Sequence, residues 1–186
     1  MNKRLIVLEG FDRSGKNTLL EDLKKENLPN TYVYDGFLDN LPKYDKEEGK
    51  FIDWLNKLID KQTTDVLNLL KTYDTVIMVR LIVSDEVYSK LFNREHTTIK
   101  YMSKLKDIEI FNYCLLFKNY YEYLKRLDLI HDTNIQYDKN NFDSINNLYK
   151  EILKNIRYKY YINYVNFDTS KEDILNNFKN IIYNYE

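Results

Sequence analysis

A glycine-containing turn joins the first aliphatic run of this sequence to its first amphipathic segment. The run covers residues 4–9, and the turn reads Gly10-Phe-Asp-Arg-Ser-Gly15-Lys16, a G-x-x-x-x-G-K spacing. Backbone N–H groups of such a turn can surround a phosphate, while the next helix N-terminus and the lysine add positive charge. The chain has only four glycines, and two of them lie here. The turn therefore predicts a phosphate-binding loop between a buried strand and a helix.

Strand-like and helix-like segments alternate along the chain. Short aliphatic or aromatic runs predict strands at residues 4–9, 31–37, 75–81, 108–117 and 161–167. Apolar residues at helical spacing predict helices at 16–25, 50–61, 64–73, 84–92, 120–129, 142–158 and 171–183, with Ser84 as an N-cap. No linker or repeat divides the 186 residues. We therefore predict a single α/β domain over residues 1–186: a P-loop NTPase three-layer sandwich, whose five-stranded parallel sheet has helices on both faces.

Composition limits the classes of partner. The 28 basic and 29 acidic residues nearly cancel, so charge gives no reason to expect a nucleic-acid or membrane partner. No apolar run reaches transmembrane length, and the run after Met1 is too short for a signal-peptide core. The one cysteine, Cys114, lies in an apolar run and indicates a buried strand residue, which fits a reducing cytoplasm. The absence of alanine indicates AT-rich codons, as in a low-GC bacterium or its phage.

The phosphate loop and its flanks resemble the thymidylate kinase signature E-G-x-D-R-x-G-K-[ST]-T. The Asp12-Arg13 pair makes this match much more specific than the glycine spacing. The resemblance implies ATP-dependent phosphorylation of a deoxynucleoside monophosphate, most simply dTMP to dTDP. It assigns Asp12 to the 3′-hydroxyl of the acceptor sugar and Arg13 to the transferred phosphoryl group. The residues that would hold ATP phosphates are Gly10, Ser14, Gly15, Lys16, Asn17 and Thr18.

A second segment, from Val79 to Ser89, resembles the family pattern D-R-Y-x-x-S-x-x-A-Y. The resemblance assigns Arg80 to the acceptor 5′-phosphate and places Tyr88 near the 2′ edge of the sugar, with Ser84 also on the substrate side. Catalysis would then rest on positioning and on charge neutralisation. The predicted catalytic residues are Lys16, Arg13, Arg80 and Asp12.

The remaining matches are weaker. Residues 137–142 and 165–173 resemble the closing pattern of the family, in which the loop before the last helix borders the adenine. The resemblance implies a lid around residues 126–141, with Arg126 on the ATP side, and a homodimer formed through helices beside the third strand. Phe37 and Trp54 are candidates for contact with the acceptor base. For Trp54, base stacking and core packing on an amphipathic helix both remain open.

Two departures from the family pattern fall on the metal side. Asn17 replaces the Ser or Thr whose hydroxyl binds Mg²⁺, although an amide oxygen can also bind a hard cation. Val79 replaces an aspartate. Asn17 is therefore the candidate Mg²⁺ ligand. These departures suggest one alternative, a catalytically impaired homologue that still binds nucleotides. A separate alternative is a deoxynucleoside kinase of the same fold with Asp35 as the base, although Val79 cannot supply the glutamate that such kinases carry at the third strand.

Overall fold

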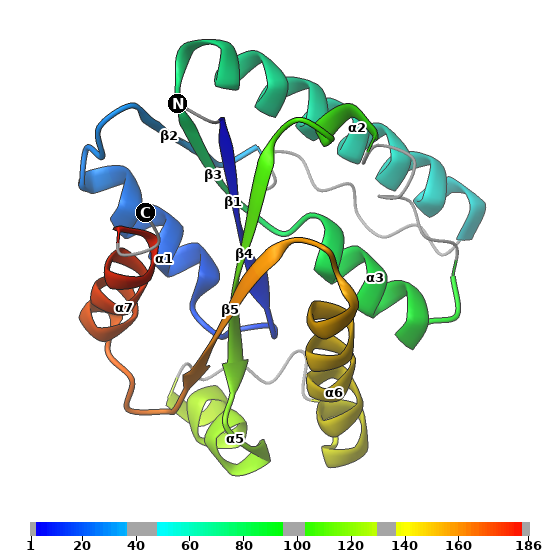
Figure 1. Ribbon diagram of the computed structural model, residues 1–186. Coiled ribbons are helices and arrows are strands. Elements are labelled where there is room, and N and C mark those ends of the chain that lie inside the picture. The colour runs from blue at the N-terminus through cyan, green and yellow to red at the C-terminus, as the bar shows by residue number, and fades with distance from the viewer. Residues whose placement is uncertain (1–2, 37–47, 95–102, 130–136, 184–186) are drawn as a thin grey trace.

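The computed structural model describes residues 3–36, 48–94, 103–129 and 137–183 (Figure 1). Within these ranges, five parallel strands form one sheet in the order β2-β3-β1-β4-β5. The strands are β1 (Arg4–Gly10), β2 (Thr31–Tyr34), β3 (Thr75–Val79), β4 (Glu109–Phe117) and β5 (Lys159–Val165). The predicted five-stranded parallel sheet is confirmed.

Helices cover both faces of the sheet (Figure 1). On one face lie α1 (Lys16–Lys25) and α7 (Lys171–Tyr183), and on the other lie α2 (Glu48–Thr72), α3 (Ile82–Leu91) and α6 (Lys139–Asn155). The shorter α5 (Tyr120–Leu129) lies near the carboxyl end of β4, and a 3₁₀ turn, η1 (Ser103–Leu105), precedes β4. This is the three-layer arrangement that the alternating pattern predicts. No helix in the described ranges is both long and apolar enough to cross a membrane.

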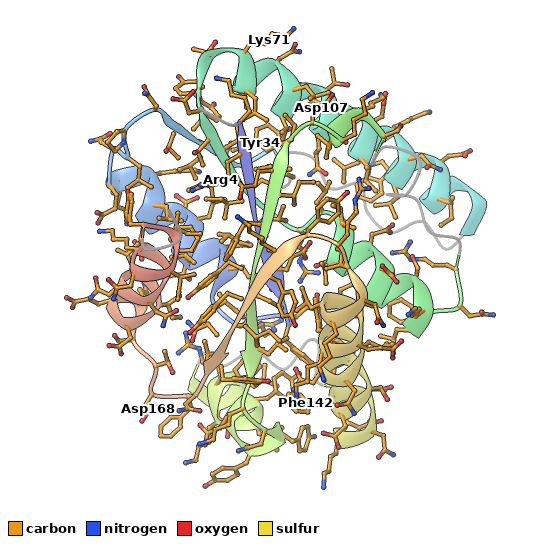
Figure 2. All side chains as sticks on the ribbon, viewed as in Figure 1. Arg4, Tyr34, Lys71, Asp107, Phe142 and Asp168 are labelled. Carbon is orange, nitrogen blue, oxygen red and sulfur yellow. The ribbon has the colours of Figure 1, made fainter. Side chains whose placement is uncertain are left out.

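The aliphatic run of β1 is buried on both sides. Leu5 and Val7 belong to a core cluster with α2, whereas Ile6 and Leu8 belong to a cluster with α1. All four side chains have no exposed surface, because successive strand residues point to opposite faces and both faces are covered. Side chains fill the space between the sheet and both helical layers (Figure 2). Cys114 is buried in β4, as predicted.

Some element boundaries differ from the prediction. The segments predicted at 50–61 and 64–73 form one helix, α2, because apolar spacing continues through the polar residues between them. The helix predicted at 142–158 begins at Lys139, since the Asp138 carboxylate accepts the N–H of Asn141 at 2.8 Å and caps its N-terminus. β5 lies two residues earlier than predicted, and a turn follows it in which Thr169 Oγ1 accepts the N–H of Asn166 at 2.8 Å.

The prediction that Ser84 caps α3 is wrong. The helix begins at Ile82, its N-cap position is Leu81, and that residue supplies no side-chain cap. β3 ends at Val79 rather than at residue 81, because Arg80 adopts φ 57° and turns the chain away from the sheet. The side chain that satisfies the first N–H groups of α3 comes from β1, as described below.

Gly10 is a position where the fold requires glycine. Its φ is 125°, and a Cβ atom would lie 2.0 Å from the carbonyl oxygen of Leu115. We expect Gly10→Ala to destabilise the protein by about 3 kcal/mol, or lower Tm by roughly 10 °C, because the obstructing atom is backbone. Gly15→Ala is the matched control, since Gly15 also has a positive φ, 100°, but its Cβ would meet the Ile174 side chain, at 3.3 Å, rather than backbone; it should therefore lose less stability. Equal loss of stability in the two variants would contradict this explanation.

Candidate active site

The phosphate loop begins at the carboxyl end of β1 and ends at the first turn of α1. Phe11 anchors it: its N–H donates to Leu115 O at 3.0 Å, and its wholly buried ring packs on Phe117, Tyr123 and Phe142 at centroid distances of 5.9, 5.2 and 5.0 Å. The labelled Phe142 belongs to α6, on the side that packs against α5 (Figure 2). This aromatic packing fixes the loop before any ligand is present, which lowers the entropic cost of binding a phosphate.

Lys16 lies under the loop and is 5% exposed. Its ammonium group donates to the carbonyl oxygens of Gly10, at 3.0 Å, and Phe11. Burial, and then the charge of Arg80, lower the pKa of Lys16 to about 7. The ammonium therefore lies in a place where an added anion would stabilise its charge, as a phosphate-binding lysine requires.

This lowered pKa predicts proton uptake when a phosphate group binds. A phosphate beside Lys16 favours the charged form, so binding at pH 8 should take up close to one proton. Affinity should then fall by up to about tenfold for each pH unit above 7. The measurement is the calorimetric heat of ATP binding in buffers of different ionisation enthalpy. Lys16→Arg stays charged at these pH values and should show almost no uptake. Equal uptake by both proteins would exclude Lys16 as its source.

Asp12 is the centre of a cluster that joins three elements. Its carboxylate forms an ion pair with Arg80 and accepts hydrogen bonds from the Tyr88 hydroxyl at 3.1 Å and the Tyr137 hydroxyl at 2.9 Å. The guanidinium carbon of Arg80 lies 5.5 Å from the centroid of the Tyr88 ring. The structure thus brings together three of the predicted site residues: Asp12 of the phosphate loop, and Arg80 and Tyr88, which reach it from the segment after β3.

The charges in this cluster balance locally. Burial acts to raise the pKa of Asp12, but the charges of Arg80 and Lys16 outweigh it, so the pKa lies below its usual value. Burial also raises the pKa of the Tyr88 phenol to about 12. At neutral pH the cluster is therefore an ionised carboxylate, a guanidinium and neutral phenols. A sugar hydroxyl can bond to the carboxylate, and an anionic group can bond to the guanidinium.

Three residues near the cluster were not predicted as site residues. Tyr137 and Tyr149 lie in or beside the segment that resembles the closing pattern of the family, but neither was given a role, because the sequence does not rank them among its 18 tyrosines. Glu9 carried a signal, since it is a carboxylate at the end of an otherwise apolar strand. It is wholly buried and accepts hydrogen bonds from the start of α3. The Tyr149 hydroxyl lies 2.9 Å from Gly10 O and 3.1 Å from Ser84 Oγ.

The other predicted residues are more dispersed. Asn17 is exposed and Thr18 half-buried at the start of α1, and Arg13 in the loop has φ 64°. Ser84 is 4% exposed and its hydroxyl is bonded to Glu9, so we propose no substrate contact for it. Ser14, also buried, donates to Phe11 O at 2.8 Å.

Arg126 donates to the carbonyl oxygen of Phe167 at 3.3 Å, and Glu122 accepts the N–H of that residue at 3.0 Å. Residues of the first and last turns of α5 therefore hold the loop between β5 and α7. Trp54 lies half-buried on α2, in the same helical layer as α3, and is not among the described residues that bond to Asp12. Phe37 and residues 130–136 of the predicted lid lie outside the described residues.

The described residues fit a protein-held Mg²⁺ poorly. Val79 is 4% exposed and lies in the apolar core, so no carboxylate occupies the position where the resemblance places one. The carboxylates of Glu9 and Asp12 already accept several hydrogen bonds or ion pairs. The described ranges contain no group of three His, Cys, Asp or Glu side chains suited to a metal. A divalent cation at this site would have to be held mainly by the phosphates of its nucleotide.

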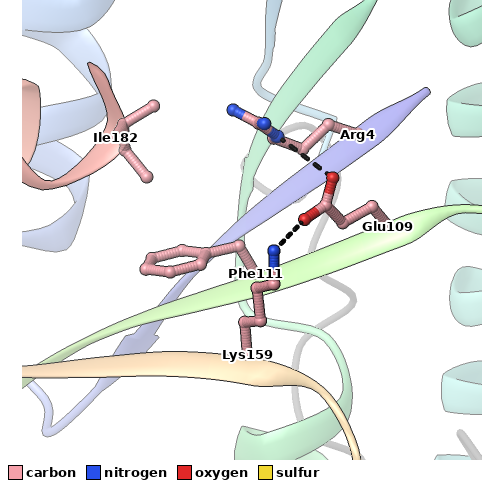
Figure 3. Close-up of a pocket in the computed structure, with 5 residues that line it drawn as sticks. All are labelled: Arg4, Glu109, Phe111, Lys159 and Ile182. Atoms are coloured by element: carbon pink, nitrogen blue, oxygen red, sulfur yellow. Dashed lines mark hydrogen bonds and ion pairs between the residues drawn. The ribbon is translucent and has the colours of Figure 1, made fainter. Parts of the chain in front are cut away.

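A small hollow at the other end of the sheet is not part of this site (Figure 3). It measures about 10 Å³, enough for about one water molecule. Its charges are paired with each other: one carboxylate oxygen of Glu109 lies 2.6 Å from Lys159 Nζ, and the other lies 3.6 Å from Arg4 Nε. The hollow therefore offers no free charge to a ligand.

Comparison with known proteins finds likeness in structure alone. No family model and no curated protein matches the sequence. A thymidylate kinase from Candida albicans is 16% identical, with a TM-score of 0.63 over 98% of this chain and 92% of that one. The YorR protein from Bacillus subtilis, solved in complex with phosphorylated GDP, is 22% identical, with a TM-score of 0.59 over 96% and 95%.

A deoxyadenosine kinase from M. mycoides, solved with the products dCMP and dCDP, is 14% identical, with a TM-score of 0.54 over 98% of this chain and all of that one. These likenesses extend over nearly the full length of each chain. The predicted P-loop NTPase architecture is thereby confirmed, and the chain has the fold that P-loop nucleoside and nucleotide kinases share.

Proposed function

We propose that this protein is a kinase that transfers the γ-phosphoryl group of ATP to the 5′-phosphate of a deoxynucleoside monophosphate, with dTMP as the first candidate. The observation that carries the proposal is the Asp12–Arg80–Tyr88 cluster beside a phosphate loop. It offers an acceptor for a sugar hydroxyl and a cation for a phosphate, on the acceptor side of a loop suited to a nucleoside triphosphate. The thymidylate kinase signature around Asp12 and Arg13 supports the same assignment.

In the proposed reaction, an oxygen of the acceptor 5′-phosphate forms a bond to the γ-phosphorus while the bond from that phosphorus to the β,γ-bridging oxygen breaks. The products are ADP and a nucleoside diphosphate. Lys16, Arg13 and Arg80 supply the positive charge that offsets the charge on the transferred group. Their preorganised positions, and the alignment of the two nucleotides, would account for catalysis. A Mg²⁺ ion would enter with ATP, bound through its phosphates, and Asn17 is the protein residue nearest to the usual ligand position in sequence.

The test is a coupled assay for nucleoside diphosphate with ATP, Mg²⁺ and a panel of deoxynucleoside monophosphates. We expect turnover with at least one monophosphate, with dTMP the first to examine. Absence of turnover with the whole panel would defeat the proposal. Calorimetry with ATP then separates two remaining cases, because binding without turnover would identify a nucleotide-binding homologue that has lost activity. Sedimentation of the same sample measures whether the chain forms the homodimer that the resemblance implies.

A deoxynucleoside kinase is the second candidate, since M. mycoides deoxyadenosine kinases share the fold. This alternative needs a base to activate a 5′-hydroxyl. Asp35 follows β2 as that role requires, but its carboxylate is paired with Lys24 of α1 at 2.7 Å. Arg80 is a cation suited to an acceptor phosphate, so it favours a nucleoside monophosphate over a deoxynucleoside as the acceptor. Turnover of a deoxynucleoside, with none for its monophosphate, would reverse this order.

A further inference from the structure

A buried carboxylate connects the phosphate loop to the start of α3. Glu9 is the residue before Gly10 in β1, and its side chain has no exposed surface. Burial raises its pKa, although hydrogen bonds from Ser84 and Leu81 oppose this. A buried carboxylate is costly, and a polar group of this kind persists only where it is fully bonded or serves another purpose.

The Glu9 carboxylate caps α3 from another element. One oxygen accepts the N–H groups of Leu81 at 3.0 Å and Val83 at 3.1 Å. The other accepts the N–H of Ser84 at 3.1 Å and also its hydroxyl. The first N–H groups of a helix have no partner within it, and Leu81 at the N-cap supplies none. Glu9 thus satisfies the donors that a local Ser, Thr or Asp usually satisfies.

This cap lies directly beside Arg80. The backbone of Arg80 is fixed on one side by its own N–H, which donates to Leu8 O at 3.0 Å, and on the other by the Leu81 N–H bond to Glu9. Between these two bonds Arg80 has φ 57°, a conformation that costs a non-glycine residue roughly 1 kcal/mol or more. The two anchors on β1 hold the turn whose side chain reaches Asp12.

Two buried hydroxyl groups lie between this carboxylate and the loop. Ser84 Oγ donates to Glu9, the Tyr149 hydroxyl donates to Gly10 O at 2.9 Å, and the two hydroxyl oxygens lie 3.1 Å apart. Gly10 O also accepts from Lys16 at 3.0 Å. The network is buried throughout, so its bonds are not in competition with bulk water.

We infer that Glu9 is a positioning residue for the acceptor side of the site: it holds the Leu81–Ser84 turn so that the Arg80 guanidinium stays beside Asp12. This inference rests on the proposed function in so far as Arg80 binds the acceptor phosphate. A residue that acts through Arg80 should affect the acceptor nucleotide, and should leave the donor nucleotide almost unchanged.

The kinetic test compares Glu9→Gln with Glu109→Gln, a carboxylate at the opposite end of the sheet. An amide keeps the shape of Glu9 but presents an NH₂ group to donors that need an acceptor. We expect the KM for the monophosphate to rise about tenfold or more and the KM for ATP to change less than twofold, whereas Glu109→Gln changes neither. In an Arg80→Ala background the further effect of Glu9→Gln should vanish. Equal weakening of both substrates, or an undiminished effect without Arg80, would overturn the inference.

A second measurement does not depend on activity. In NMR spectra, the Arg80 Nε–H signal and the amides of Leu81, Val83 and Ser84 should exchange slowly in the wild type and in Glu109→Gln, and markedly faster in Glu9→Gln. If the wild type phosphorylates no monophosphate, the proposed function fails, yet this readout still tests the positioning role. Slow exchange of Arg80 in a folded Glu9→Gln protein would overturn it. If Glu9→Gln does not fold, Ser84→Ala serves instead, because it removes the hydroxyl group that donates to the Glu9 carboxylate.

Discussion

Replacing Lys16 with methionine is expected to stabilise the protein and abolish nucleotide binding. The folded state keeps this ammonium buried, at a pKa of about 7 rather than 10.5. One pKa unit corresponds to about 1.4 kcal/mol, so the charge costs at most about 5 kcal/mol below pH 7. Lost hydrogen bonds to the loop carbonyls offset part of this, and methionine fills the space of the stem. We expect a net gain of about 1–3 kcal/mol in the free energy of unfolding, measured with urea at pH 6.

The pH dependence identifies the cause of this stabilisation. Between pH 7 and 10.5 the unfolded lysine binds a proton that the folded lysine has lost, so the stability of the wild type rises with pH across this window. Methionine has no such slope. The advantage of Lys16→Met should therefore be largest below pH 7 and disappear near pH 10. Calorimetry should show ATP affinity reduced at least about 100-fold.

Lys24→Met is the matched control, because Lys24 lies on the same helix but is partly exposed and paired with Glu21 and Asp35. It should neither stabilise the protein nor change ATP binding. A Lys16→Met protein less stable than the wild type at pH 6 would contradict the assigned cost of burial.

Replacing Arg80 with alanine is expected to reduce both stability and activity. The change leaves the Asp12 carboxylate without its ion-pair partner; within the described part of the chain, the Tyr88 and Tyr137 hydroxyls still donate to it, and the charge of Lys16 still acts on it. Loss of one partner of a fully buried ion pair lowers the free energy of unfolding by about 3–5 kcal/mol. Because the Arg80 and Asp12 side chains are 20% and 28% exposed, we expect a smaller loss of about 1–3 kcal/mol. Turnover should fall about 10³-fold, as for other arginines that bind a reacting phosphate. Urea unfolding at pH 7 and single-turnover kinetics measure the two effects.

The double variant Arg80→Ala/Asp12→Asn separates the two effects. The amide that Asp12→Asn introduces is neutral and needs no cation. The stability of the double variant should therefore recover, while its activity stays low. The wild-type pKa of Asp12 lies below 3.8, so the stability from this pair is present above that pH and is lost as the pH falls through the folded value. A double variant as unstable as Arg80→Ala would show that the unpaired carboxylate is not the cause.

The phosphate loop, the order of strands and helices, and the layering of the fold could all be predicted from the sequence. These features depend on local signals: the spacing of Gly10, Gly15 and Lys16, and runs of apolar residues that must be buried on one face or two. The helices at 16–25, 120–129 and 171–183 were predicted with the boundaries observed. Residues close in the sequence determine both the apolar faces and the ends of these helices.

The start of α3 and the surroundings of Asp12 depend instead on contacts between residues far apart in the sequence. Ser84 has the residue type of a local cap, but Glu9, 75 positions away in sequence, reaches the same donors and moves the helix start to Ile82. Tyr137 reaches Asp12 across 125 positions. A sequence lists the donors and acceptors available, whereas the pairing of strands β3, β1 and β4 sets which of them meet. The loop was therefore predictable, and the carboxylate that ties it to Arg80 was not.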